Sequence, residues 1–269
     1  MTHIGVAHVT RLAKEPICSA FNEFWPEAAI SDFEDYDLPP ARAAAGCETA
    51  EIKKRIANLA AQAVDAGVDG LLFTCAAFGE SIDLVAERLP IPVLKPNEAM
   101  FREALMIGGR VGLVATFAPS IQIISDEYAA LARDVGKNPE LKTVCAENAM
   151  SAALSGNSWK HDTLIAEAAK SLGECDVIMM AQLTMISARS IVRELTGIEP
   201  LTSPASAVKM LRFMIDEQTR ASSLHWGWHA GGGAGRKRNC PRNQPARRSP
   251  ASDRRQGHLD CDRWFARRL

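Results

Sequence analysis

The order of strand-like segments in this chain occurs twice, and that repeat limits the folds it can adopt. Three apolar segments of the first half match three of the second half in the same order and at a nearly constant offset. The matched pairs are 4–7 with 111–114, 69–75 with 176–182, and 92–96 with 200–204. Because the three segments keep one order at nearly one offset, the sequence predicts an internal duplication.

Helix-like segments separate the strand-like ones. In the stretch 49–66, apolar residues recur at helical spacing, at Ile52, Ile56, Leu59, Ala60 and Ala63. Thr49 is a candidate N-cap for this helix, and Gly67 follows its end. Alternation of strands and helices is typical of βαβ units with mainly parallel sheets. We therefore predict an α/β fold of two similar lobes, with the active site in the cleft between them at the carboxyl ends of the strands.

The repeat also predicts the domain boundaries. Residues 1–100 form the first lobe and 101–206 the second, and the apolar segment 207–220 is expected to pack back on the first lobe. Residues 221–269 form a separate basic tail with 11 Lys and Arg against 3 Asp and Glu, whereas the segment 1–220 holds 20 and 29. This tail is rich in Arg, Pro and Gly, so we expect it to be disordered.

Two other interpretations of the tail stay open. One is a basic arm for nucleic acid, which we do not expect because the tail lacks heptads, a zinc pattern and a basic amphipathic helix. The other is a shift of reading frame near residue 220, suggested by the excess of Arg and Pro and by three of the five tryptophans. An intact mass that matches all 269 residues would exclude the frame shift.

Composition excludes several classes of protein. Hydrophobic residues make up 47% of the chain, as in a globular domain, yet no apolar run is long enough to cross a bilayer. The N-terminus lacks the pattern of a signal peptide, so no membrane partner is expected. Seven scattered cysteines without a CxxC pair argue against a disulfide framework and against a metal site. We therefore expect a cytoplasmic protein with reduced thiols.

Cys75 is the strongest candidate for a catalytic residue. It follows the apolar strand 68–74, and the small residues Ala76 and Ala77 come next. Backbone N–H groups at a helix start favour an anion and lower the pKa of a thiol, so we expect a thiolate near neutral pH. The same segment, with Thr74 and Ala76, is expected to hold a substrate carboxylate.

The repeat places Gln182 opposite Cys75, and other polar residues lie at or near strand ends. Thr184 is a further catalytic candidate, and His8 is a candidate to orient a base. The candidates for substrate contact beyond the cysteine segment are Asn97, Thr116, Ser120 and Ser203. The acidic run 32–37 is interpreted as a solvated loop.

The segments around both positions resemble the aspartate/glutamate/hydantoin racemase superfamily. Residues 68–76 are similar to its first cysteine motif, 109–116 to the first strand of its second domain, and 176–185 to its second cysteine motif. The resemblance extends over about residues 1–216. It implies two lobes related by pseudo-twofold symmetry, no pyridoxal phosphate or other cofactor, and a small-molecule carboxylate substrate. It is also compatible with a homo-oligomer.

The resemblance breaks at Gln182. In racemases of this family one cysteine removes the proton α to a carboxylate and the other protonates the opposite face, but an amide is neither acid nor base near neutral pH. We expect a racemase or epimerase that acts on an amino acid or related acid, with Thr184 or a water on the second face. Two alternatives stay open: a single-cysteine decarboxylase of the arylmalonate type or a cis-trans isomerase, and a non-catalytic carboxylate-binding protein.

Overall fold

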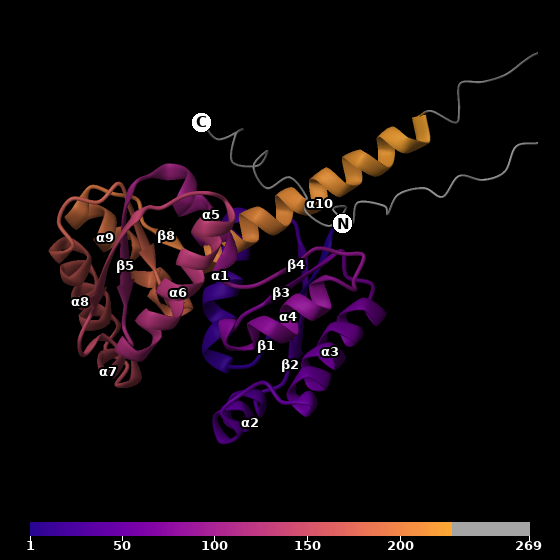
Figure 1. Ribbon diagram of the computed structural model, residues 1–269, viewed down its shortest axis with the longest axis horizontal. Helices are drawn as coiled ribbons and strands as arrows, with labels where there is room; N and C mark the ends of the chain where they lie inside the picture. The colour runs from indigo at the N-terminus through magenta and orange to yellow at the C-terminus, as the bar shows by residue number, and fades with distance from the viewer. Residues whose placement is uncertain (228–269) are drawn as a thin grey trace, which may run out of the picture. The chain divides into compact units, whose positions relative to one another are not determined.

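The computed structural model describes residues 1–227 (Figure 1). Residues 1–212 form one compact unit, and a second unit begins at Phe213. Most of the tail lies outside the described residues, so the interpretations of residues 228–269 stay predictions. Across the described part of the chain, no helix is both long and apolar enough to span a membrane.

The first sheet is parallel and has four strands in the order β2-β1-β3-β4. These strands are β1 (His3–His8), β2 (Ala29–Glu34), β3 (Gly70–Phe73) and β4 (Val93–Leu94). In the centre, Ile4 is paired with Gly70 and Ala7 with Phe73. The carboxyl ends of β1 and β3 therefore lie side by side, which places His8 next to Thr74.

The second sheet repeats this arrangement with the order β6-β5-β7-β8, again all parallel. Its strands are β5 (Arg110–Ala115), β6 (Glu140–Cys145), β7 (Val177–Met180) and β8 (Leu201–Thr202). Each strand of the first sheet has its counterpart four strands later in the same sheet position. The predicted α/β fold of two similar, mainly parallel lobes is confirmed.

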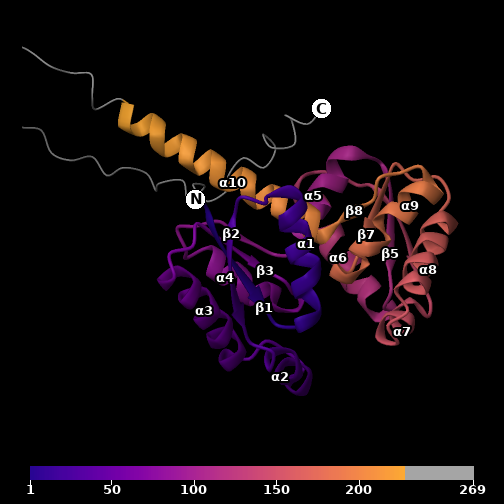
Figure 2. The ribbon, with the colours of Figure 1, turned by 180° about the vertical axis from the view of Figure 1, so that it is seen from behind.

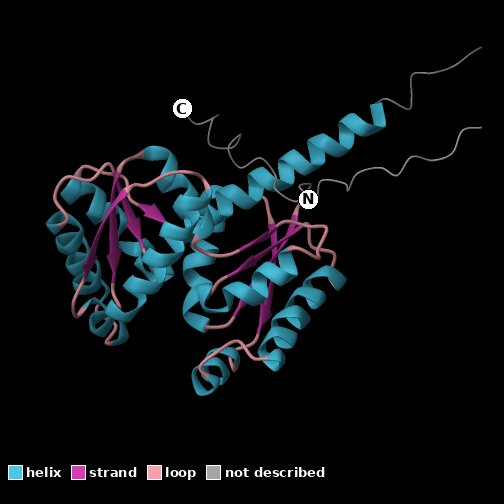
Figure 3. Ribbon diagram, in the orientation of Figure 1, coloured by secondary structure: helices cyan, strands magenta, loops and turns pink. Residues whose placement is uncertain are grey.

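Helices flank both sheets, as Figure 3 shows and as the view from behind in Figure 2 repeats. In the first half they are α1 (Lys14–Phe24), α2 (Leu38–Ala45), α3 (Ala50–Asp65), α4 (Gly79–Ala86) and α5 (Glu98–Ile107). In the second half they are α6 (Ala118–Asp134), α7 (Ala149–Leu154), α8 (Ser158–Ser171), α9 (Arg189–Thr196) and α10 (Ser203–Gly227). Three short 3-10 helices follow the ends of β1, β3 and β7, namely η1 (Arg11–Ala13), η2 (Ala76–Phe78) and η3 (Leu183–Ala188).

Helix α3 forms where the sequence predicts it. The hydroxyl oxygen of Thr49 accepts a hydrogen bond from the N–H of Ile52, which caps the first turn. All five predicted apolar residues are buried, and they pack on the first sheet in one cluster with Leu71 and Phe73. Gly67, with a φ of +72°, supplies the left-handed conformation just beyond the helix end.

Equivalent glycines lie in the central strands of both sheets. A Cβ at Gly5 would lie 3.1 Å from a methyl carbon of Leu71 and 3.3 Å from Ala63. At Gly112, which holds the matching position in β5, a Cβ would lie 2.7 Å from Leu172, a contact that real side chains do not make. Both strands therefore use glycine where neighbouring side chains approach the backbone closely.

The first turns of α10 are anchored by buried hydroxyl groups. Ser203 donates to the carbonyl oxygen of Pro96, and Ser206 donates to Glu103 Oε2 over 2.7 Å. Glu103 is itself buried on α5, so its hydrogen bond to Ser206 offsets part of the cost of burying a carboxylate. Both bonds connect segments that are far apart in the sequence. The predicted boundaries at residues 100 and 206 stay predictions.

Candidate active site

Cys75 lies between β3 and η2, at the carboxyl end of the first sheet. Its backbone is extended, with φ −141° and ψ 124°, so the chain turns into η2 directly after it. The thiol is free and partly buried against the apolar cluster that contains Phe73 and Phe78. The backbone N–H of Ala77, in the turn that follows, acts to lower the pKa of this thiol.

The pKa of Cys75 corrects one expectation. Burial raises the pKa of the thiol above its usual value, and the charge of Glu127 raises it slightly further. The Ala77 N–H and the charge of Arg42 lower the pKa, but their effect is smaller than that of burial. The thiol is therefore mostly protonated near neutral pH, because the loss of hydrating water destabilises the thiolate more than the Ala77 N–H and the charge of Arg42 stabilise it.

The side chain of Thr74 is turned inward rather than toward solvent. It is 4% exposed, and its hydroxyl donates to the carbonyl oxygen of Ala7 over 3.3 Å. The same oxygen lies 3.4 Å from His8 Nδ1. A buried hydroxyl with two internal partners holds the strand ends together, so a direct contact of Thr74 with substrate stays a prediction. Ala76 begins η2 and presents only its backbone and a methyl group.

Three predicted residues of the second lobe meet in one hydrogen-bonded group. The oxygen of the Gln182 side chain accepts from the backbone N–H of Thr116 over 2.8 Å and from its hydroxyl over 3.3 Å. The Gln182 amide nitrogen donates to Ser120 Oγ over 2.9 Å. Ser120 in turn donates to the carbonyl oxygen of Phe117. The group joins the end of β7 to the first turn of α6.

Thr184 lies apart from this group and lines a pocket of about 700 Å³. The pocket lies between η1 and α1 on one side and η3 and α9 on the other. Because η1 follows β1 and η3 follows β7, the pocket adjoins the carboxyl ends of both sheets. Cys75 and Gln182 are not among the residues that line it, so their opposition across one pocket stays a prediction.

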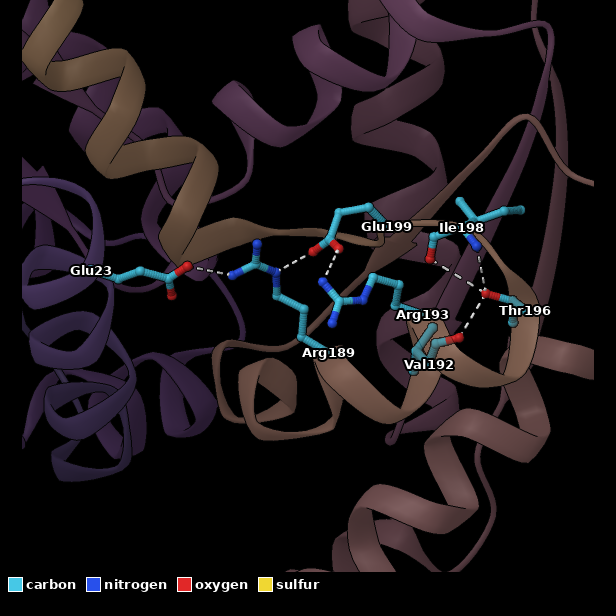
Figure 4. A network of polar contacts seen from close by, with 7 residues as sticks. All are labelled: Glu23, Arg189, Val192, Arg193, Thr196, Ile198 and Glu199. Carbon is cyan, nitrogen blue, oxygen red and sulfur yellow. Dashed lines mark hydrogen bonds and ion pairs between the residues drawn. The ribbon is translucent and has the colours of Figure 1, made fainter.

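Charged side chains connect the two walls of this pocket, as Figure 4 shows. Arg189 on α9 donates to Glu23 on α1 over 2.8 Å and also pairs with Glu199. Arg193 reaches Glu199 over 3.4 Å. The guanidinium of Arg189 also lies 5.5 Å from the ring of Phe24, close enough for a cation–π contact. Arg189 thus ties the first lobe to the second beside Thr184.

Asn97 and Ser203, the two other residues predicted to contact substrate, are both buried. Asn97 is 7% exposed and precedes α5, yet its side chain does not cap that helix. Ser203 is completely buried, and its hydroxyl donates to the carbonyl oxygen of Pro96, so its contact with substrate stays a prediction.

The acidic run 32–37 is not a solvated loop throughout, which corrects that interpretation. Its first residues belong to β2, where Asp32 contacts His8 Nε2 over 3.2 Å. Asp35 forms an ion pair with Arg55 of α3. Exposed and partly buried side chains alternate along 29–34 in the structure, but residue type does not follow that alternation, so the sequence gives only a weak signal for this strand. Nothing in the sequence indicates that Asp32 and His8 are partners, because they belong to different strands.

Comparisons of the sequence and of the structure with known proteins both find racemases of one family. The family model described as Asp/Glu/Hydantoin racemase matches residues 28–211, more than half of the chain. No curated protein sequence matches. An allantoin racemase from Pseudomonas fluorescens is similar in structure, with a TM-score of 0.60 and 17% identity over 81% of this chain and 92% of the other.

Two other solved structures share the fold. A glutamate racemase from Bacillus anthracis has a TM-score of 0.58 and 15% identity, over 81% of this chain and 82% of the other. A double mutant of arylmalonate decarboxylase has a TM-score of 0.57 and 13% identity, over 80% and 93%. At such low identity the likeness shows the fold, while the chemistry must be argued from the site.

Proposed function

Because the chain belongs to the Asp/Glu/hydantoin racemase family, we propose that it is a racemase-type enzyme in which Cys75 moves a proton at the α-carbon of an amino acid or related carboxylic acid. The observation that supports this proposal most is the position of Cys75 between the end of β3 and the start of η2, at the carboxyl end of the first sheet. The reaction needs no cofactor in this proposal, since the thiol itself is the proton carrier.

Substrate would be held by backbone N–H groups at the strand ends. The turn at Ala76 begins beside Cys75, and the N–H and hydroxyl of Thr116, just before α6, would become available to a carboxylate that displaces Gln182 Oε1. A carboxylate at the start of α6 would also gain from the dipole of this long helix. Thr116 is 7% exposed, so a ligand there would be largely removed from water.

Racemisation requires an acid on the second face, and the structure limits the choices for it. Gln182 has no titratable proton, and both ends of its amide already have partners. Thr184 or a water molecule would have to serve, and a hydroxyl without an adjacent base is a poor acid–base group.

The burial of Cys75 against an apolar cluster favours a second candidate function, a decarboxylase or isomerase that uses one thiol. Burial raises the pKa of the thiol and so favours its protonated form, which is the form that donates a proton to an enediolate. One donor on one face would yield a single enantiomer. The arylmalonate decarboxylase fold match is compatible with this candidate but does not distinguish it from the first.

Exchange in deuterated water tests both candidates. Wild-type protein and the Cys75→Ala variant are incubated with amino acids, hydantoins and substituted malonates, and deuterium at the α-carbon is measured by NMR. Cysteine-dependent deuterium with loss of optical activity supports the racemase. Deuterium in one enantiomer, with release of carbon dioxide, supports the one-thiol enzyme. Exchange that is equal in both proteins would contradict the role of Cys75 and leave a carboxylate-binding protein as the better description.

A further inference from the structure

A chain of polar contacts runs from the end of β3 to the edge of the first sheet. Thr74 Oγ1 lies 3.4 Å from His8 Nδ1, and His8 Nε2 lies 3.2 Å from Asp32 Oδ1. Lys14 on α1 contacts the other carboxylate oxygen of Asp32 over 3.1 Å. His8 is 1% exposed and Thr74 is 4% exposed, so the contact between these two residues is closed to bulk water.

Asp32 determines which nitrogen of neutral His8 carries the proton. A carboxylate only accepts hydrogen bonds, so Nε2 bears the hydrogen and Nδ1 is left as an acceptor. The hydroxyl of Thr74 then has two acceptors for its one proton, His8 Nδ1 and the carbonyl oxygen of Ala7 at 3.3 Å. When His8 gains a proton, Nδ1 donates to Thr74, and the hydroxyl proton is directed to Ala7. Protonation therefore reverses a hydrogen bond to the residue that precedes Cys75.

The charges that face His8 oppose one another. Burial is the largest influence and lowers the pKa of His8 below its usual value. Asp32 and Glu34 on β2 favour the cation, whereas Lys14 on α1 disfavours it. The imidazole is therefore mostly neutral at pH 7, and the balance among these charges affects how far its pKa lies below the usual value.

We propose that His8 is a positioning residue that couples its own protonation to the thiol of Cys75 across Thr74. The inference rests on the proposed function, in which Cys75 is the proton carrier. A cation on His8 stabilises a thiolate at the adjacent strand end, whereas neutral His8 leaves that thiolate without the cation. Coupling between two binding equilibria is reciprocal, so a negative charge at position 75 must also increase the proton affinity of His8.

The reciprocal effect can be measured without any substrate. His8 is titrated by NMR in the full-length protein carrying Cys75→Asp or Cys75→Asn, two side chains of similar shape that differ in one charge. We expect the proton affinity of His8 to be at least about threefold higher with the aspartate. Equal titration of His8 in the two variants would overturn the proposal.

A second measurement substitutes the two partly exposed charged residues beside His8, Lys14 and Asp32, and Asp32→Asn keeps a side-chain oxygen that can still accept from His8 Nε2. The rate of Cys75 alkylation by iodoacetamide is followed from pH 5 to 9 at the level of the peptide. In the wild type we expect a break in the logarithm of the rate where His8 titrates. Lys14→Gln should move this break to higher pH and Asp32→Asn to lower pH, because one removes a cation and the other an anion. A straight line in all three proteins, or shifts in the same direction, would overturn the coupling.

The two measurements separate this proposal from the proposed function. If His8 and Cys75 are coupled but no cysteine-dependent deuterium exchange is found, the role of His8 stands and the proposed enzymatic activity is rejected. Deuterium exchange without coupling would keep the enzyme and reject the role of His8.

Discussion

Thr116 and Gln182 are joined at a single atom, because both the backbone N–H and the hydroxyl of Thr116 donate to Gln182 Oε1, over 2.8 and 3.3 Å. The amide oxygen therefore occupies the acceptor position that a carboxylate oxygen would take at the start of α6. A ligand bound there must share these donors with Gln182 or displace it.

Replacing Gln182 with cysteine should supply the proton carrier that the second face lacks. We expect the Gln182→Cys variant to equilibrate the enantiomers of a substrate or product at least about 100-fold faster than the wild type, the usual scale of one acid–base group. Loss of optical activity over time measures this rate.

The matched control is Gln182→Ser, which frees Thr116 without adding a thiol. If both variants racemise the substrate at the same increased rate, the release of Thr116 is the cause. The expectation that a second thiol at position 182 carries the proton is then wrong.

Removing the sulfur of Cys75 should remove the chemistry while keeping the fold. We expect Cys75→Ser to lower deuterium incorporation at the α-carbon by a factor of about 100 to 10,000, because a hydroxyl is a far weaker acid and base than a thiol. Cys175→Ser is the control, since that cysteine precedes β7 and packs near Gly112, away from the carboxyl ends of β3 and β7. Equal losses in both variants would point to a general effect on folding.

The pH dependence of thiol reactivity follows from the raised pKa of Cys75. A higher pKa means a smaller thiolate fraction at any pH below it, so Cys75 should be alkylated more slowly than the exposed Cys47 at pH 7.5. Its rate should still be rising with pH beyond 9. Mass spectrometry of the two peptides gives both rates in one sample. Faster reaction of Cys75 at neutral pH would show that the N–H of Ala77 outweighs burial.

Three glycines should differ in their tolerance of a methyl group. Gly112→Ala places a Cβ 2.7 Å from Leu172, and we expect it to lower the free energy of unfolding by about 1–3 kcal/mol. Gly5→Ala, with its nearest contact at 3.1 Å, should cost less. Gly109→Ala has no neighbour within 4 Å and is the control, with a change near zero. Urea unfolding of the three variants measures the order, and a reversed order would contradict the close approach at Gly112.

The sequence predicted much of the fold because repeats and apolar periodicity are local patterns. The nearly constant offset between matching segments indicated two similar lobes, and both sheets indeed share one strand order. The spacing of apolar residues in 49–66 predicted α3, including its cap at Thr49. Strand ends could be located in the same way, so the positions of Cys75 and Gln182 at those ends followed.

The contacts within the site could not be predicted, because they join residues from separate elements of the chain. Gln182 after β7 meets Thr116 after β5, and His8 of β1 meets Asp32 of β2. The direction in which the pKa of Cys75 shifts could not be predicted either. Backbone N–H groups at a helix start lower this pKa and burial raises it, and the packing around the thiol decides which effect is larger. Ser203 shows the same limit: a serine after a strand end can face a ligand or, as here, a buried carbonyl group.

The shared strand order also bears on the stereochemistry of any product. Two copies of one strand end can present a flat intermediate with the same kind of donor from either side, so the fold by itself prefers neither hand. Under the proposed function, the preference would arise where the copies differ, with sulfur at position 75 and an amide at position 182. A duplicated scaffold of this kind can change the chirality of what it makes by exchanging two side chains, with no new backbone required.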